Sequence, residues 1–344
     1  MKINRKELLE KLKLIKPVLS NNSNIEDHSS FLFTGTEIIT YNNDMSIGVE
    51  FESDFKCLIK ADKFFDLVSN IDDDFIMVKI TKGLMSVNSK KTKAKLVLVE
   101  GAEDDVISII RPDKKIKWKK LPLDFMEGVG LCIFSAGRDM VKPINTCLYI
   151  NKNTISSTDN LRLSQFKMKT EIEDTFLLSV FSAIELVKFK IIKYCVQEKW
   201  IFFKTDDNVI FCSRKMEGSF FKLDHVLNVE GKKFVLNKDI IKIIKVGSLF
   251  SDGAFNYDKY MDVEIKDNKI KCSSTLSSAS VMGVMNIESD VSDMDIKFRI
   301  NPDFFKTILE KINDVIYSDG GTSILFWNEN FKHVIALYSN NRNK

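Results

Sequence analysis

The chain has 344 residues, 44% of them hydrophobic, which is enough to bury two or three ordinary cores. No apolar run reaches the roughly 18 residues that a membrane span requires, and the start at Met1 does not resemble a signal peptide, so we expect neither a membrane protein nor a secreted one. The net charge is +3, and only seven of the 51 basic residues are arginine. Lysine suits loose phosphate contact better than base reading, although an AT-rich genome would produce the same lysine excess.

Cysteine and histidine usage bears on redox compartment and metal binding. The six cysteines are scattered without a CxxC pair, which predicts reduced, buried thiols in a cytoplasm. The histidines at 28, 225 and 333 share no ligand spacing. The sequence also contains no P-loop, GxGxxG, HExxH or GxSxG motif. We therefore expect no enzyme activity, no metal site and no cofactor.

One pattern occurs three times in the chain, about 120 residues apart. Each copy is a short apolar strand, a polar break and a helix that opens on a bulky pair; the copies cover residues 56–68, 175–187 and 297–309. An upstream marker recurs at Leu8-Leu9, Phe125-Met126 and Ile240-Ile241. Two markers with one period predict an internal triplication, with domains at 1–118, 119–231 and 232–344.

The first helix of each third can be predicted in chain order. Residues 5–16 have apolar positions with helical spacing and end near Pro17. The corresponding helix in the middle third is weakened by Gly128 and Gly130. In the last third a helix follows Asn237, a plausible N-cap, and carries a stripe of lysines at 238, 242 and 245.

The remaining elements alternate with these helices. In the last third, strands are predicted at 261–265, 269–273 and 280–287, with a hairpin turn at Asp267-Asn268, and a second helix begins at Asn301-Pro302. A pair of strands follows the second helix of every third: 75–87 with 93–99, 200–205 with 208–213, and 323–327 with 333–338. The predicted linkers are 111–120 and 228–233.

This organisation predicts an α+β chain in which two helices lie against an antiparallel sheet, three times in line. Each copy exposes a sheet edge, and edges that pair end to end close into a ring or continue as a filament. If the helices lie on the concave side, their lysines face a common channel. Such a channel would hold nucleic acid through its phosphates, without reading sequence.

Two segments resemble a known family. Residues 157–163, STDNLRL, resemble the A-T-D-G-H-R-L segment of the bacterial-type sliding clamp, the beta subunit of DNA polymerase III. Residues 213–223, SRKMEGSFFKL, resemble that family's S-R-x-x-E-G-x-F-P-D-Y segment at a similar distance. The strand-to-helix junctions at 58, 177 and 298 fit the same layout, so the resemblance covers essentially the whole chain. The departures from the family pattern fit a phage-encoded clamp as well as a host one.

The resemblance implies three tandem copies of the DNA-clamp fold and a head-to-tail homodimer that closes a ring around duplex DNA. Such a ring is a processivity factor and not an enzyme, because it tethers the polymerase to the template by topology. The basic residues then expected to line the channel are Lys6, Lys13, Lys16, Lys63, Arg138, Lys142, Lys188, Lys238, Lys242, Lys245 and Lys306. Without the resemblance, such lysines would be interpreted as residues of ordinary solvent-exposed helix faces.

The resemblance also implies a pocket for a short peptide of the polymerase and the clamp loader. The implied pocket residues are Ile144, Thr158, Leu161, Arg162, Leu163, Ile324, Phe326, Ile335, Ala336, Leu337 and Tyr338. The implied dimer interface consists of Leu96, Leu98, Leu249 and Phe250. The family's Gly-His is Asn160-Leu161 here, a family proline is Asn228, and the C-terminus ends in a polar tail, so the preferred peptide is expected to be non-standard.

Two alternatives remain open at this point. A clamp-like hub that acts mainly in transcription would share the ring and differ in its clients. A repeat scaffold without DNA binding would show no dependence on DNA. For the clamp we expect a cytoplasmic location at the nucleoid of a bacterial cell, or in the host cytoplasm if the chain is encoded by a phage.

Overall fold

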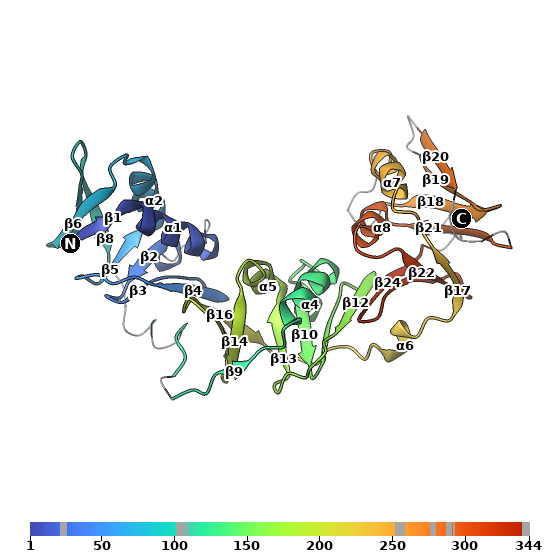
Figure 1. Cartoon of the computed structure of the whole chain (residues 1–344), viewed down its shortest axis with the longest axis horizontal. Helices are drawn as coiled ribbons and strands as arrows, with labels where there is room; N and C mark the ends of the chain where they lie inside the picture. The colour runs from blue at the N-terminus through green and yellow to red at the C-terminus, as the bar shows by residue number, and fades with distance from the viewer. Residues whose placement is uncertain are drawn as a thin grey trace. The chain divides into compact units, whose positions relative to one another are not determined.

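The computed structural model describes residues 1–20, 26–100, 107, 110–113, 115–251, 259–275, 280–286, 291 and 293–338 (Figure 1). The polar tail 339–344 and position 287 of a predicted strand lie outside these residues. The described chain is α+β and divides into two compact units, described separately below: Met1–Gly130 with Ile150–Lys152 and Lys169–Glu217, and Leu131–Tyr149 with Asn153–Met168 and Gly218–Lys344. None of the described helices has the length and apolarity to span a membrane.

The same order of elements occurs three times, which confirms the predicted repetition of strand-to-helix junctions. The first repeat comprises β1 (Lys2–Asn4), α1 (Arg5–Ile15), β2 (Ser30–Phe33), β3 (Glu37–Tyr41), β4 (Met45–Glu50), β5 (Cys57–Lys60), α2 (Ala61–Asn70), β6 (Phe75–Thr81), β7 (Leu84–Asn88) and β8 (Lys93–Val99). The second comprises β9 (Lys119–Lys120), α4 (Phe125–Cys132), β10 (Cys147–Asn151), β11 (Thr154–Thr158), β12 (Arg162–Lys167), β13 (Phe176–Ser179), α5 (Val180–Leu186), β14 (Ile191–Val196), β15 (Trp200–Thr205) and β16 (Ile210–Met216).

The third repeat follows a short helix, α6 (Asp224–Leu227). It comprises β17 (Gly231–Val235), α7 (Ile240–Ser248), β18 (Met261–Lys266), β19 (Lys269–Thr275), β20 (Ser280–Asn286), β21 (Asp295–Ile300), α8 (Pro302–Leu309), β22 (Asp314–Ser318), β23 (Ser323–Trp327) and β24 (Phe331–Ala336). The middle repeat contributes residues to both compact units.

Local sequence signals account for the helix boundaries. The Asn4 side chain accepts hydrogen bonds from the backbone N–H groups of Lys6 and Glu7, at 3.0 and 3.2 Å, and so caps α1. Asn301 caps α8 in the same way, with Pro302 in the first turn as predicted. α4 forms in spite of its glycines because Phe125, Val129 and Cys132 are fully buried, and burial outweighs helix propensity.

In the first unit, an edge strand of the first repeat pairs with the last strand of the second. β4 and β16 are antiparallel, with Gly48 opposite Ile210 and Ser46 opposite Cys212. Arg111 lies over this seam: its Nε donates to Glu37 Oε2 at 2.9 Å, and its side chain covers Gly48 so closely that a Cβ there would lie 1.5 Å from Nη2. The segment 111–120, predicted as a linker, is therefore anchored at its start, and it ends in β9, which pairs with β14.

In the second unit, β12 and β24 make the corresponding antiparallel pair, from Arg162 opposite Ile335 to Phe166 opposite Phe331. Within this pair His333 of β24 lies opposite Ser164, and its side chain is fully buried. Its Nδ1 is 2.9 Å from Ser164 Oγ and 3.3 Å from Ser135 Oγ, whereas Nε2 has no hydrogen-bond partner among the described residues. Burial, and secondarily the positive charge of Arg162, hold the pKa of His333 well below its ordinary value.

The neutral state of His333 predicts acid sensitivity of this seam. The unfolded chain takes up the histidine proton near its ordinary pKa of about 6.5 while the folded chain resists it, so stability present above that pH is lost as the pH falls below it. We expect the free energy of unfolding to fall by at most about 1.4 kcal/mol per pH unit from this group. Denaturation of wild type and His333→Gln between pH 7.5 and 5 measures the difference.

The matched control for this experiment is His225→Gln, because His225 is exposed. The control should follow the wild-type pH dependence, while His333→Gln should lose less stability on acidification. Parallel curves for all three proteins would show that His333 does not titrate between the folded and unfolded states as proposed.

Candidate functional site

A cavity of about 500 Å3 opens within the second unit, beside the β12–β24 pair. It is formed by the β11–β12 hairpin, the segment that contains α6, and the ends of β23 and β24. Its lining residues are Thr158, Asn160, Leu161, Arg162, Leu163, Phe221, Lys222, Leu223, His225, Val226, Ser323, Val334 and Ala336.

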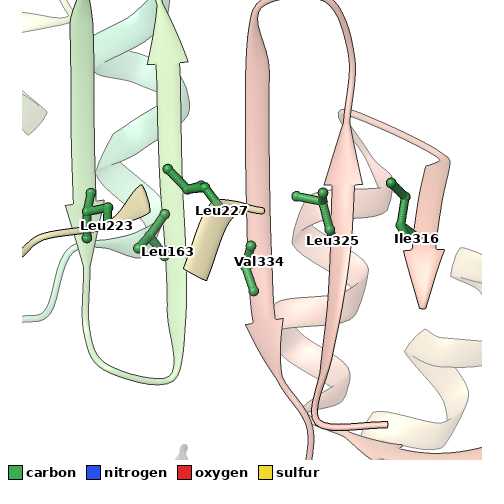
Figure 2. Packing of buried hydrophobic residues seen from close by; sticks show 6 residues of the cluster. All are labelled: Leu163, Leu223, Leu227, Ile316, Leu325 and Val334. Atoms are coloured by element: carbon green, nitrogen blue, oxygen red, sulfur yellow. The ribbon is translucent and has the colours of Figure 1, made fainter. Parts of the chain in front are cut away.

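The floor of this cavity is part of an apolar cluster. The cluster consists of the buried residues Leu163, Leu223, Leu227, Ile316, Leu325 and Val334. Figure 2 shows these side chains on β12, α6 and its approach, β24 and the strands beyond. Phe220 and Val229 pack against the cluster from the chain on either side of α6. Residues 220–229, which connect the second and third repeats, thus form one wall of the cavity.

Arg162 is the central polar residue of the cavity. Its Nε donates to Asp159 Oδ2 at 2.9 Å, and its guanidinium lies 3.9 Å from the centroid of the Phe304 ring. Asp159 Oδ1 also accepts from the backbone N–H groups of Leu161 and Arg162, at 3.0 and 2.9 Å. Burial lowers the pKa of Arg162 and Asp159 opposes the shift, but an arginine retains its charge in proteins. A fixed, partly shielded cation therefore stands at the cavity wall.

The hairpin tip explains one departure from the family pattern. Asn160, which replaces a glycine of the family, has a φ of +73°. Asparagine is one of the few side chains that adopt this left-handed conformation readily. Thr158 Oγ1 accepts from the Asn160 N–H at 3.1 Å and donates to the Arg162 carbonyl at 2.8 Å, which fixes the tip. The turn is therefore retained without glycine.

Five of the eleven predicted pocket residues line the cavity: Thr158, Leu161, Arg162, Leu163 and Ala336. Ile324, Phe326 and Ile335 do not. Side chains alternate between the two faces of a strand, and these three lie on the opposite face, where each is at most 1% exposed. Ser323 and Val334, the chain neighbours of Ile324 and Ile335, line the cavity instead.

Ile144, Leu337 and Tyr338 also lie elsewhere. Ile144 Cδ1 contacts Gly218, where an added Cβ would approach it to 2.4 Å. The chain turns away after β24, so Leu337 donates its N–H to Thr322 and Tyr338 pairs with Arg299. The lining residues that the sequence interpretation missed are Asn160, Phe221, Lys222, Leu223, His225, Val226, Ser323 and Val334. Strand alternation would have identified Ser323 and Val334.

The basic residues predicted to contact DNA are mostly free to do so. Nine of the eleven are exposed, and Lys16 and Lys306 are half-buried. Lys16 Nζ lies 3.9 Å from the centroid of the Phe65 ring. Lys6, Lys188 and Lys242 pair with neighbouring carboxylates at 3.2, 2.6 and 3.0 Å. These exposed pairs are weak, so a phosphate could displace them.

The predicted interface residues lie on β8 and at the end of α7. Leu96 and Leu98 are half-buried on β8, while Leu249 at the end of α7 is 76% exposed. The strand predicted at 280–287 is β20, an edge strand of the sheet β20–β19–β18–β21, although none of its residues was predicted for the interface. Its residues Met282 and Val284 are 60% and 54% exposed, which is unusual for large apolar side chains.

Comparison with solved structures identifies the fold. The chain is similar to the beta subunit from the DNA polymerase of Streptococcus pyogenes, with 21% identity and a TM-score of 0.83 over 98% of this chain and 99% of that chain. The sliding clamp of Bacillus subtilis gives 16% identity and 0.83 over 98% of each chain. The polymerase III beta subunit of Pseudomonas aeruginosa gives 14% identity and 0.83 over 98% and 99%.

These similarities extend over nearly the whole chain, so the fold is that of the sliding clamps, as the sequence resemblance predicted. A scan against protein-family models found no match, and neither did a search of curated proteins.

Proposed function

We propose that this chain is a DNA sliding clamp: a non-catalytic processivity factor that encircles duplex DNA and tethers a replicative polymerase. The observation that carries the proposal is that the clamp fold extends over 98% of the chain and includes a peptide-sized apolar cavity with a basic rim. The three-domain division at 118 and 231 belongs to the same proposal. So does the expected place of action, the nucleoid in a bacterial cytoplasm or in that of a phage's host.

Ring closure follows from the repetition of one strand pairing. β4 of the first repeat pairs with β16, and β12 of the second repeat pairs with β24. β4, β12 and β20 hold equivalent places in their repeats, as do β8, β16 and β24. By the same rule β20 would pair with β8 of a second copy, head to tail. Two chains joined by two such seams form a closed ring of six repeats, in which the edges of β8 and β20 are paired like those at the other seams.

In such a ring, weak contacts between lysine side chains and DNA phosphates are sufficient. The exposed lysines of α1, α2 and α7 supply point charges suited to phosphates, and tight or base-specific contacts would resist sliding. Polymerase and loader would bind through the cavity. Its apolar floor suits an aliphatic or aromatic anchor of a short peptide, and Arg162, Lys222 and His225 suit acidic or carbonyl groups beside that anchor.

The edge strand provides the first test. Met282→Glu with Val284→Glu places two carboxylates in the proposed β20–β8 seam, and desolvating them would prevent dimer formation. Light scattering should give a dimer for wild type and a monomer for the double variant. Val187→Glu, at an exposed valine of similar character after α5, should remain dimeric. A wild-type monomer at micromolar concentration would contradict the ring.

The lysines at 238, 242 and 245 provide the second test; Lys242 and Lys245 lie on α7, whereas Lys238, predicted on the same helix, lies in the turn before it. Replacing Lys238, Lys242 and Lys245 by glutamate should weaken retention on DNA and reduce the slope of log affinity against log salt by roughly one unit per lost contact. Sequence preference should not change. The control is the triple variant Lys199→Glu, Lys232→Glu and Lys269→Glu, which alters net charge equally at exposed positions off these helices. Equal losses in both variants would assign the effect to overall charge alone.

The cavity provides the third test. Ala336→Tyr fills the cavity from an exposed position of β24 without removing a core side chain. Affinity for a labelled C-terminal peptide of the cognate polymerase should fall by about tenfold or more, which corresponds to one lost apolar anchor of about 1.5–3 kcal/mol. Thr170→Tyr, at an exposed position outside the cavity, should bind as wild type does. Unchanged affinity in Ala336→Tyr would place the peptide site elsewhere.

A further inference from the structure

One sheet occurs in equivalent form in all three repeats: β1–β6–β7–β8, β9–β14–β15–β16 and β17–β22–β23–β24. One face of this sheet, called the outer face below, carries Phe202 in the second repeat. The segment that leads into the second repeat covers this face, because its residues Ile116 and Trp118 pack on the cluster around Phe202. In the third repeat the entering chain does the same, because Leu223 and Leu227 pack on the cluster that contains Leu325. Twice, then, this face is covered by a short segment with two apolar side chains.

The equivalent face of the first repeat has no such cover among the described residues. The register aligns its outward side chains in rows, with Lys2, Met77, Asn88 and Lys93 in one row and Lys79, Ser86 and Lys95 in the next. Thr81, Leu84 and Val97 make a further row. Phe75, Met77 and Val97 are 50%, 51% and 72% exposed, so the face has apolar contact area that no part of the described chain uses.

This face also carries uncompensated positive charge. Lys2, Lys79, Lys93 and Lys95 form no ion pair within the described ranges; Lys2 instead lies 4.2 Å from the Phe75 ring centroid. The acidic run 72–74 flanks only the Phe75 end, where Asp74 pairs with Lys6 and Asp73 accepts from the Lys90 N–H. The rows containing Lys79, Lys95 and Val97 include no carboxylate.

A second sheet of the chain shows that such charges can be compensated internally. On the sheet of β18, β19 and β21, Arg299 pairs with Asp262 at 2.7 Å, Lys297 with Glu264 at 2.9 Å and Lys266 with Asp295 at 3.1 Å. Cross-strand pairs of opposite charge stabilise a sheet. The first repeat therefore departs from a pattern that the same chain follows elsewhere.

We propose that the outer face of β1–β6–β7–β8 binds a short acidic segment of a partner protein, laid across the sheet as the chain's own entering segments are in the second and third repeats. Apolar side chains of the partner would cover Met77, Leu84 and Val97. Its carboxylates would pair with Lys79, Lys93 and Lys95. Duplex DNA fits this face poorly because the charged rows alternate with exposed apolar side chains that phosphates cannot cover.

The test uses a short fluorescent peptide in which leucine and valine alternate with aspartate, titrated against the full chain. Wild type should bind it, and Lys79→Glu with Lys95→Glu should weaken binding by about tenfold or more, since each exposed pair contributes up to a factor of about five and reversal replaces attraction with repulsion. The matched variant Lys199→Glu with Lys269→Glu, of equal net charge, should bind as wild type does. Met77→Ser with Val97→Ser should also weaken binding while leaving charge unchanged.

Three outcomes would overturn the proposal. If both lysine variants bind the peptide equally weakly, the effect comes from overall charge and not from this face. If Met77→Ser with Val97→Ser binds as wild type does, the peptide makes no apolar contact with these side chains. Finally, the labelled peptide is displaced by competitors. If single-stranded oligothymidylate displaces it at a lower concentration than unlabelled peptide does, the face binds nucleic acid instead. Thermal unfolding of each variant verifies that it is folded, which is expected because all six substituted side chains are exposed.

Discussion

Antiparallel pairing between repeats is the interaction on which the rest of this structure depends. β4 with β16 and β12 with β24 place main-chain groups of neighbouring repeats opposite one another, so each seam satisfies donors and acceptors that would otherwise face solvent. The pairing also determines the site. The cavity exists because β12 and β24 adjoin, since its floor takes Leu163 from one repeat and Val334 from the next.

Main-chain pairing alone would leave each seam covered on one side only, and the connecting segments supply the second layer. Arg111 lies over the first seam, and Leu227 packs over the second, so each connection follows the joint that it spans. The first connection is held by the hydrogen bond between Arg111 and Glu37, and the second by apolar contacts. The second seam has a polar contact of its own, since Nδ1 of the buried His333 lies within hydrogen-bond distance of Ser164 on the opposite strand.

The repeat and its helices were predictable because they rest on local signals. Asn4 and Asn301 cap helices through their own side chains, and the turn at Asp267 and Asn268 uses residues that tolerate positive φ, here 51° and 58°. The cavity was only partly predictable. Apolar residues such as Ile324 and Val334 look alike in a sequence, and only the register between β23 and β24 decides which face each one takes. The contribution of residues 221–226 depends on where a linker folds back, which no local pattern determines.

The contact between Gly48 and Arg111 has a consequence for the evolution of this chain. The guanidinium occupies the space that any other side chain at position 48 would need, with only 1.5 Å between Nη2 and a built Cβ. A side chain at 48 would displace the guanidinium of Arg111, and loss of the arginine leaves Glu37 without its partner. A side chain at 48 is therefore compatible with a shorter residue at 111 rather than with the arginine. Related chains that carry the arginine should carry the glycine as well.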